Sequence, residues 1–104
     1  MKYSVQHGLS DVSQVRAVVD KAYEAYKERL ANHDPTLNWN GDDRAKIEFS
    51  VMGKKISTDV RIDEKELNIQ GDLPWAFKFF EKKILDVVGG EVDKWLDKAR
   101  KGEL

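Results

Sequence analysis

The sequence contains no cysteine, and it has only two prolines and two histidines among its 104 residues. Without cysteine, disulfides, thiolate metal sites and cysteine catalysis are excluded. No apolar run approaches the roughly 18 residues of a transmembrane helix, and the first residues lack the apolar stretch of a signal peptide. We therefore expect a cytoplasmic protein with no transmembrane segment.

Charge is abundant but balanced, because 18 basic residues oppose 19 acidic ones and leave a net charge of −1. Proteins that bind nucleic acid usually carry a clear basic excess, so we expect no nucleic-acid partner. Hydrophobic residues make up 40% of the chain, which is typical of a folded protein. A chain of this length is expected to form a single α+β domain over residues 1–104.

Alternation of apolar and polar residues predicts strands, and apolar residues at three- and four-residue spacing predict helices. Ser10 is the expected N-cap of the first helix, with Asp11 in its first turn. Strands are expected at about residues 2–9, 37–40, 45–52, 56–62 and 67–72, and helices at about residues 11–32 and 75–100.

One face of the expected strands is almost wholly polar, and an antiparallel sheet can leave such a face in water. The helices must then cover the other face. The expected fold is a two-layer α+β sandwich of order β-α-β-β-β-β-α, with a mostly antiparallel sheet and two helices on one face. On the wet face, cross-strand charge pairing would account for Glu48, Asp59 and Arg61. The polar face comprises Glu48, Ser50, Asp59, Arg61, Asn68 and Gln70.

The last 30 residues predict one long amphipathic helix from Trp75 to Arg100. Gly89 and Gly90 lie within it, and each costs about 1 kcal/mol relative to alanine. Three interpretations of this pair remain open: a bend, a break, or a close approach of the backbone to a neighbour. At about 100° per residue, the apolar face comprises Phe77, Phe80, Ile84, Val88 and Trp95.

The sequence carries no recognisable catalytic motif, nucleotide-binding loop or calcium loop. His7 lies on the apolar side of the first strand, where a structural histidine is the expected interpretation and a general base the alternative. His33 follows the first helix, where a cationic imidazole would cap the helix end. We expect no enzyme, no cofactor and no metal site.

An unusual aromatic pair opens the C-terminal helix. Trp75 and Phe79 are four residues apart and fall on the polar side of the helical wheel, flanked by Lys78, Lys82 and Lys83. Exposed rings rimmed by ammonium groups suit the boundary between water and an apolar phase, so these five residues form the candidate binding site. In the alternative interpretation, Trp75 precedes the regular helix and folds over the end of the sheet together with Phe79.

The segment LNWNGDDRAKIEFSVMGKKISTDVRIDEKELNIQGDLPWAFKFF, residues 37–80, resembles the small bacterial proteins of the polyhydroxyalkanoic acid system (granule-region) family. The resemblance rests on a Trp-x-Gly-Asp turn at residues 39–42, a glycine turn between alternating strands, and the Leu73-Pro74-Trp75 entry to the last helix. It implies a context in storage-granule gene clusters, and it supplies no catalytic residues.

From the resemblance and the aromatic pair together, we expect a non-enzymatic protein of storage-granule metabolism that binds a granule surface or a granule protein. The alternative is a small carrier with a hydrophobic ligand between the sheet and a bent long helix, as in helix-grip folds. The chain is expected to be a monomer or a homodimer.

Overall fold

The computed structural model describes all residues from 1 to 104. Its strands are β1 (Lys2–Gln6), β2 (Thr36–Trp39), β3 (Arg44–Val51), β4 (Lys54–Ile62) and β5 (Glu66–Gly71). Its α-helices are α1 (Val12–Lys27) and α2 (Glu81–Arg100). Two short 3₁₀ helices, η1 (Ala31–His33) and η2 (Trp75–Phe80), follow α1 and precede α2.

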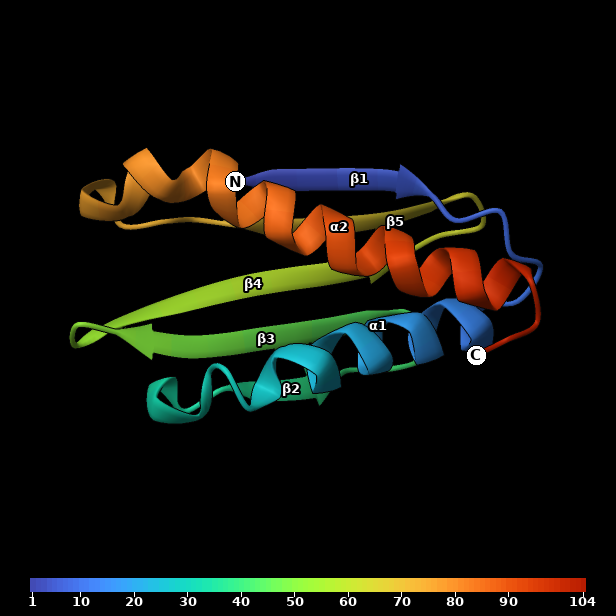
Figure 1. Cartoon of the computed structure of the whole chain (residues 1–104), viewed down its shortest axis with the longest axis horizontal. Helices are drawn as coiled ribbons and strands as arrows, with labels where there is room; N and C mark the ends of the chain where they lie inside the picture. The colour runs from blue at the N-terminus through green and yellow to red at the C-terminus, as the bar shows by residue number, and fades with distance from the viewer.

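The strands form one five-stranded sheet in the order β1-β5-β4-β3-β2, and every neighbouring pair is antiparallel (Figure 1). Strands β2 to β5 are a meander, and β1 joins its far edge by pairing with β5. Val60 at the centre of the sheet lies opposite Ala45 on one side and Ile69 on the other. This register brings the apolar residues onto one face, because side chains alternate along each strand.

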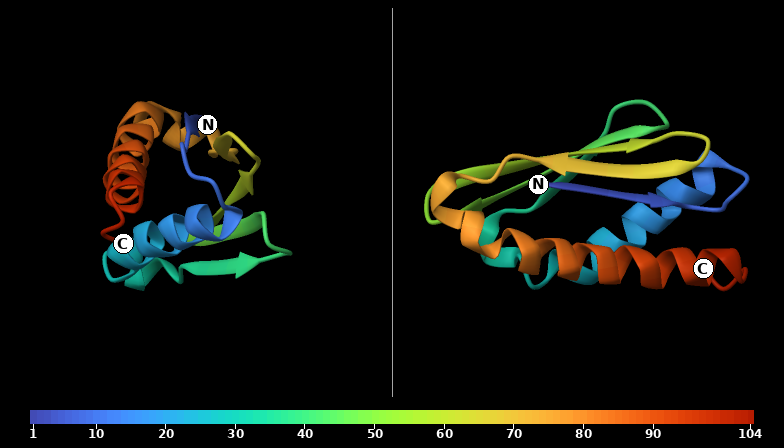
Figure 2. Two further views of the ribbon diagram at one scale, coloured as in Figure 1. Left: turned by 90° about the vertical axis from the view of Figure 1, so that its right-hand side faces the viewer. Right: turned by 90° about the horizontal axis from the view of Figure 1, so that it is seen from above.

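Both helices cover the same face of the sheet (Figure 2). The alternation in β4 shows this arrangement most clearly, since Val60 and Ile62 are buried while Asp59 and Arg61, the residues that precede them, are exposed. The predicted two-layer α+β fold, with its element order and its wet sheet face, is therefore confirmed.

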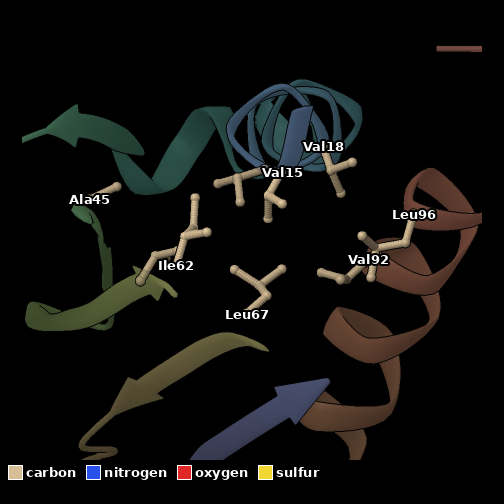
Figure 3. Close-up of a cluster of buried hydrophobic side chains, with 9 residues drawn as sticks. Val15, Val18, Ala45, Ile62, Leu67, Val92 and Leu96 are labelled. Atoms are coloured by element: carbon tan, nitrogen blue, oxygen red, sulfur yellow. The ribbon is translucent and has the colours of Figure 1, made fainter. Parts of the chain in front are cut away.

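A cluster of nine buried side chains joins the two layers (Figure 3). The first half of α1 and the second half of α2 meet over the centre of the sheet, where Leu67 and Leu96 are fully buried. The other members are Val15, Val18, Val19, Ala45, Val60, Ile62 and Val92. Toward the start of α2 the packing is looser, because Ile84, Leu85 and Val88 remain partly exposed.

Three expected boundaries are wrong. Strand β1 ends at Gln6, not at residue 9, because Gly8 turns the chain with a φ of 65°. Asp11, not Ser10, is the N-cap of α1, since its side chain accepts a hydrogen bond from the backbone N–H of Ser13 at 3.0 Å. Helix α1 ends at Lys27, and the predicted stretch to residue 32 forms a turn and η1 instead.

The paired glycines do not break α2, which continues through both of them. Gly89 is buried, and a Cβ atom at this position would lie 3.0 Å from Cε2 of Tyr3. Gly90 faces open space. Of the three interpretations, the close approach therefore holds for Gly89, which lets the edge strand β1 pack directly against the helix backbone.

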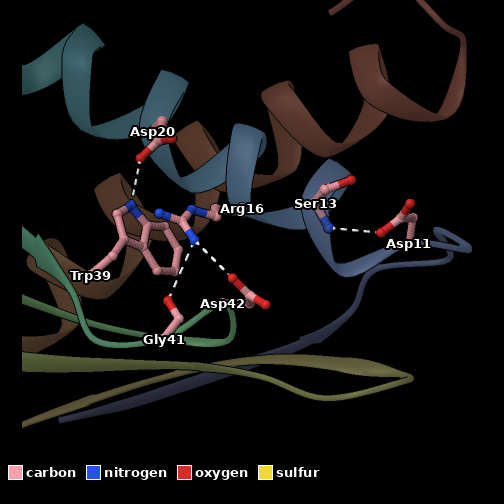
Figure 4. Close-up of polar contacts among 7 residues, drawn as sticks. All are labelled: Asp11, Ser13, Arg16, Asp20, Trp39, Gly41 and Asp42. Carbon is pink, nitrogen blue, oxygen red and sulfur yellow. Dashed lines mark hydrogen bonds and ion pairs between the residues drawn. The ribbon is translucent and has the colours of Figure 1, made fainter.

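The Trp39–Asp42 turn ties β2 to α1 (Figure 4). Trp39 donates its indole N–H to Asp20 at 2.9 Å, and the guanidinium of Arg16 lies 4.5 Å from the centre of the indole ring. Arg16 also donates to the carbonyl oxygen of Gly41 and pairs with Asp42. The tryptophan, glycine and aspartate of the turn thus all contact one arginine of α1. Their role is structural.

Candidate functional site

The aromatic segment before α2 is a 3₁₀ helix, so the prediction of a regular α-helix from Trp75 is wrong. The backbone N–H of Phe77 donates to the carbonyl of Pro74, and that of Glu81 donates to the carbonyl of Lys78. Each bond spans three residues, as 3₁₀ geometry requires. Such turns are frequent at the start of α-helices, where the first N–H groups lack partners within the α-helix.

This geometry changes which side chains share a side of the segment. With about three residues per turn, residues three apart are aligned and residues four apart diverge by about 120°. Phe77 and Phe80 are therefore aligned on one side of the segment, and Trp75 and Phe79 point in different directions. The argument that Trp75 and Phe79 share one side of an α-helix fails, although both rings are outside the core.

Exposure in η2 is high throughout. Trp75 is 82% exposed and Phe79 is 90% exposed, so neither ring folds over the sheet end. Phe77 is the only half-buried residue of the segment. Phe80, expected on the buried face of a long helix, is 55% exposed. The 3₁₀ segment carries it beyond the region where α2 covers the sheet, which is why the α-helical phase misplaced it.

The lysines around these rings are free of acidic partners. Lys78, Lys82 and Lys83 are exposed, and none forms an ion pair. Glu81, the acidic residue next to Lys82, instead pairs with the N-terminal ammonium group at 3.2 Å. The three lysines around the rings therefore carry positive charges that no ion pair neutralises, although the whole chain carries a net charge of −1.

A further exposed apolar residue was missed at the sequence level. Met52, in the turn between β3 and β4, is 86% exposed and has a φ of 51°. Lys54, two residues later, is exposed and has no ion pair. In both Figures 1 and 2, this turn and η2 lie at the same end of the molecule, opposite the C-terminus.

We call this region the aromatic end. Its apolar members are highly exposed side chains, and its charged members are lysines without carboxylate partners. It comprises Met52, Trp75, Phe79 and Phe80 together with Lys54, Lys78, Lys82 and Lys83. Strand alternation offers no reason to expect Met52 here, since the position of a turn relative to η2 depends on the sheet order.

Each histidine has a ring nitrogen that is hydrogen-bonded to a backbone carbonyl. His7 is buried; its Nδ1 accepts the backbone N–H of Leu9 at 3.1 Å, so its Nε2 carries the proton donated to the carbonyl of Asp63 at 2.8 Å. Nδ1 of His33 lies 2.8 Å from the carbonyl of Ser50, to which it donates, tying η1 to β3. Both rings have structural partners, and the expected helix-capping role of His33 is replaced by this cross-tie.

The acidic residues do not gather into a site. No group of three or more histidine, aspartate or glutamate side chains has the geometry to bind a metal ion. Asp63 has its pKa lowered because its carboxylate accepts the backbone N–H groups of Glu66 and Lys65. That arrangement stabilises the turn between β4 and β5.

The fold and the aromatic end define a small α+β protein whose most distinctive surface is apolar and cationic. A family model matches residues 2–98, and its description is "Putative polyhydroxyalkanoic acid system protein". The chain belongs to this family, which confirms the resemblance and connects it with the polyhydroxyalkanoate system. No curated protein and no solved structure gives a significant match. Neither helix combines the length and hydrophobicity needed to cross a membrane.

Proposed function

We propose that this chain is a non-enzymatic cytoplasmic protein of the polyhydroxyalkanoate system that binds the surface of a storage granule through its aromatic end. The observation that carries the proposal is the exposure of Trp75 and Phe79, at 82% and 90%, beside lysines that have no acidic partner. Large aromatic side chains are usually buried, so two exposed rings in one short segment favour an interface. The family membership supplies the granule context.

The energetics favour a combined contact. Burying a large aromatic side chain removes roughly 150–250 Å² from water, so at about 25 cal/mol per Å² each ring contributes roughly 4–6 kcal/mol at most. Association itself costs about 4–15 kcal/mol. Burial of the two rings therefore roughly offsets the cost of association and leaves little net binding energy. Each lysine near an anionic surface adds about 1 kcal/mol, so the lysines would decide whether binding is measurable.

The test is co-sedimentation with polyhydroxyalkanoate particles. We expect the unchanged chain to bind and a Trp75→Ser/Phe79→Ser variant to lose binding. Unfolding stability should change by no more than about 0.5 kcal/mol, because both side chains are largely in water. Leu104→Ser is the matched control, since Leu104 is 43% exposed and lies at the opposite end of the chain's fold.

Two results would contradict the proposal. Failure of the unchanged chain to bind particles would remove the granule surface as the partner. Equal binding by the double variant would remove the aromatic end as the contact. If the double variant instead forms a different oligomer from the unchanged chain in sedimentation, the aromatic end is a homodimer interface.

The carrier alternative receives no support from the packing. It requires an apolar cavity between the sheet and the long helix, but Val60, Val92 and Leu96 fill the space where the second half of α2 crosses the sheet. Two surface depressions lie elsewhere, one between α1 and β2 and one on the open face of the sheet. Native mass spectrometry that finds no co-purified acyl species would agree with this choice.

A further inference from the structure

The open face of the sheet contains an unfavourable charge arrangement. Arg44 on β3 and Arg61 on β4 are direct cross-strand partners. Their side chains leave the same face as near neighbours, and like charges in such positions destabilise a sheet. Both residues are exposed, and neither forms an ion pair. The expected pairing of Arg61 with Glu48 or Asp59 does not occur, because Glu48 pairs with Lys55 and Asp59 with Lys46.

The two arginines line a depression in this face, which we call the basic basin. Its other cations are Lys2 on β1 and Lys46 on β3, and Asp59 is its only carboxylate. Four positive charges against one negative charge leave a local charge of +3, in a chain whose net charge is −1. The one ion pair inside the basin, Lys46 with Asp59, is long at 3.9 Å.

Neutral donors complete the lining. Side-chain amides of Gln70 on β5 and Asn40 before β3 border the basin, and neither is engaged in a hydrogen bond within the chain. Asp63 lies close enough to Arg61 for the arginine to lower its pKa. Its carboxylate accepts the backbone N–H groups of the following turn and forms no ion pair with Arg61, so the Arg61 guanidinium has no direct partner.

The lining distinguishes among anionic ligands. No aromatic side chain borders the basin, so it lacks the stacking platform that single-stranded nucleic acid uses. Two guanidinium groups offer planar pairs of donors that match phosphate oxygens, and the surplus charge favours an anion with more than one negative charge. Arg44 and Arg61 are direct partners on adjacent strands, so both guanidinium groups can reach one compact ligand.

We propose that the basic basin binds a multivalent oxyanion of the phosphate class between the guanidinium groups of Arg44 and Arg61. The bound anion would relieve the repulsion between the two arginines, so binding and sheet stability are linked. This site lies on the sheet face opposite the helices, and the proposal is independent of granule binding.

Titration calorimetry with pyrophosphate at low ionic strength tests the site. We expect saturable binding by the unchanged chain, and at least an about tenfold weaker affinity for Arg44→Gln and for Arg61→Gln, since each removes charge-assisted hydrogen bonds. Arg29→Gln is the matched control, because Arg29 is an exposed arginine outside the basin. It removes the same charge and should leave the affinity nearly unchanged.

Thermal unfolding distinguishes binding at a defined site from nonspecific attraction of the anion to positive charge. Without pyrophosphate, Arg44→Gln should raise the midpoint of thermal unfolding, because it removes the cross-strand repulsion. With pyrophosphate, the unchanged chain should gain thermal stability and the variant should gain little. Absence of saturable binding, or an equal loss of affinity in Arg29→Gln, would overturn the proposal.

Discussion

The two glycines in α2 provide a sharp test of the packing between this helix and the sheet edge. Gly90 faces open space, so Gly90→Ala should add the intrinsic helical preference of alanine, about 1 kcal/mol, to the free energy of unfolding. Gly89→Ala adds the same preference. It also places a methyl group 3.0 Å from Cε2 of Tyr3, which is closer than ordinary van der Waals contact.

The Tyr3 ring cannot move aside freely. Its hydroxyl donates to Asp93 at 3.0 Å, and its strand is paired along its whole length with β5. Overpacking of this kind typically costs about 1–3 kcal/mol. Subtracting the helical gain of about 1 kcal/mol leaves a net loss of about 0–2 kcal/mol for Gly89→Ala. The two alanine variants should therefore differ by about 1–3 kcal/mol, although they are neighbours in one helix.

Urea unfolding followed by circular dichroism at the helical band measures both variants, and a Tyr3→Ala background completes the comparison. Without the ring, Gly89→Ala should become stabilising by about 1 kcal/mol, like Gly90→Ala. If both alanines stabilise the unchanged chain equally, then β1 does not pack on the helix backbone at Gly89. If Gly89→Ala remains destabilising without the ring, the cost has another source.

Two further predictions concern the cap of α1 and the edge tyrosine. Asp11→Ala should lower the free energy of unfolding in urea by about 1 kcal/mol, because Asp11 accepts the backbone N–H of Ser13. Ser10→Ala should change it little. A larger loss for Ser10→Ala than for Asp11→Ala would show that Ser10 is the cap. Burial and the hydrogen bond to Asp93 raise the pKa of Tyr3 to about 12. Its contribution to stability is therefore complete below about pH 10 and should be lost as the pH rises toward 12. The unchanged chain should lose stability relative to Tyr3→Phe over this range, and a constant difference would show that the phenol titrates normally.

The strands could be predicted from the sequence because the alternation of apolar and polar residues is consistent with only one choice of buried face. In β4, a shift of the register by one residue would expose Val60 and bury Arg61, which is far too costly to occur. The layer order follows from the same pattern, since a sheet with one wet face must carry its helices on the other.

The order of the strands and their cross-strand partners could not be predicted in this way. Alternation determines which face a residue occupies, but it does not determine which residue lies opposite. Arg61 was expected near acidic side chains and lies opposite Arg44. The basic basin therefore emerges only once β3 and β4 are aligned, and no local pattern in the sequence signals it.

At the aromatic end, prediction from the sequence failed for a different reason, which is the geometry of the helix. An α-helical wheel places Trp75 and Phe79 in the candidate site. It predicts correctly that both rings are exposed, but wrongly that they share one side of the segment. Phe80 was assigned to the core by the same wheel and is more than half exposed. A 3₁₀ turn has no distinct sequence period over six residues, so its presence before α2 could not be separated from an α-helical start.

The positions of the two proposed surfaces make their tests independent. The buried cluster joins the start of α1 to the end of α2, whereas the aromatic end lies beyond the start of α2, so removing Trp75 and Phe79 takes nothing from the core. The basic basin lies on the face that the helices leave open. A granule bound at the aromatic end would therefore leave the basin accessible. Variants at the two surfaces share no contact, so their effects on stability should add. A double variant that departs from additivity would show that the two surfaces are coupled through the sheet.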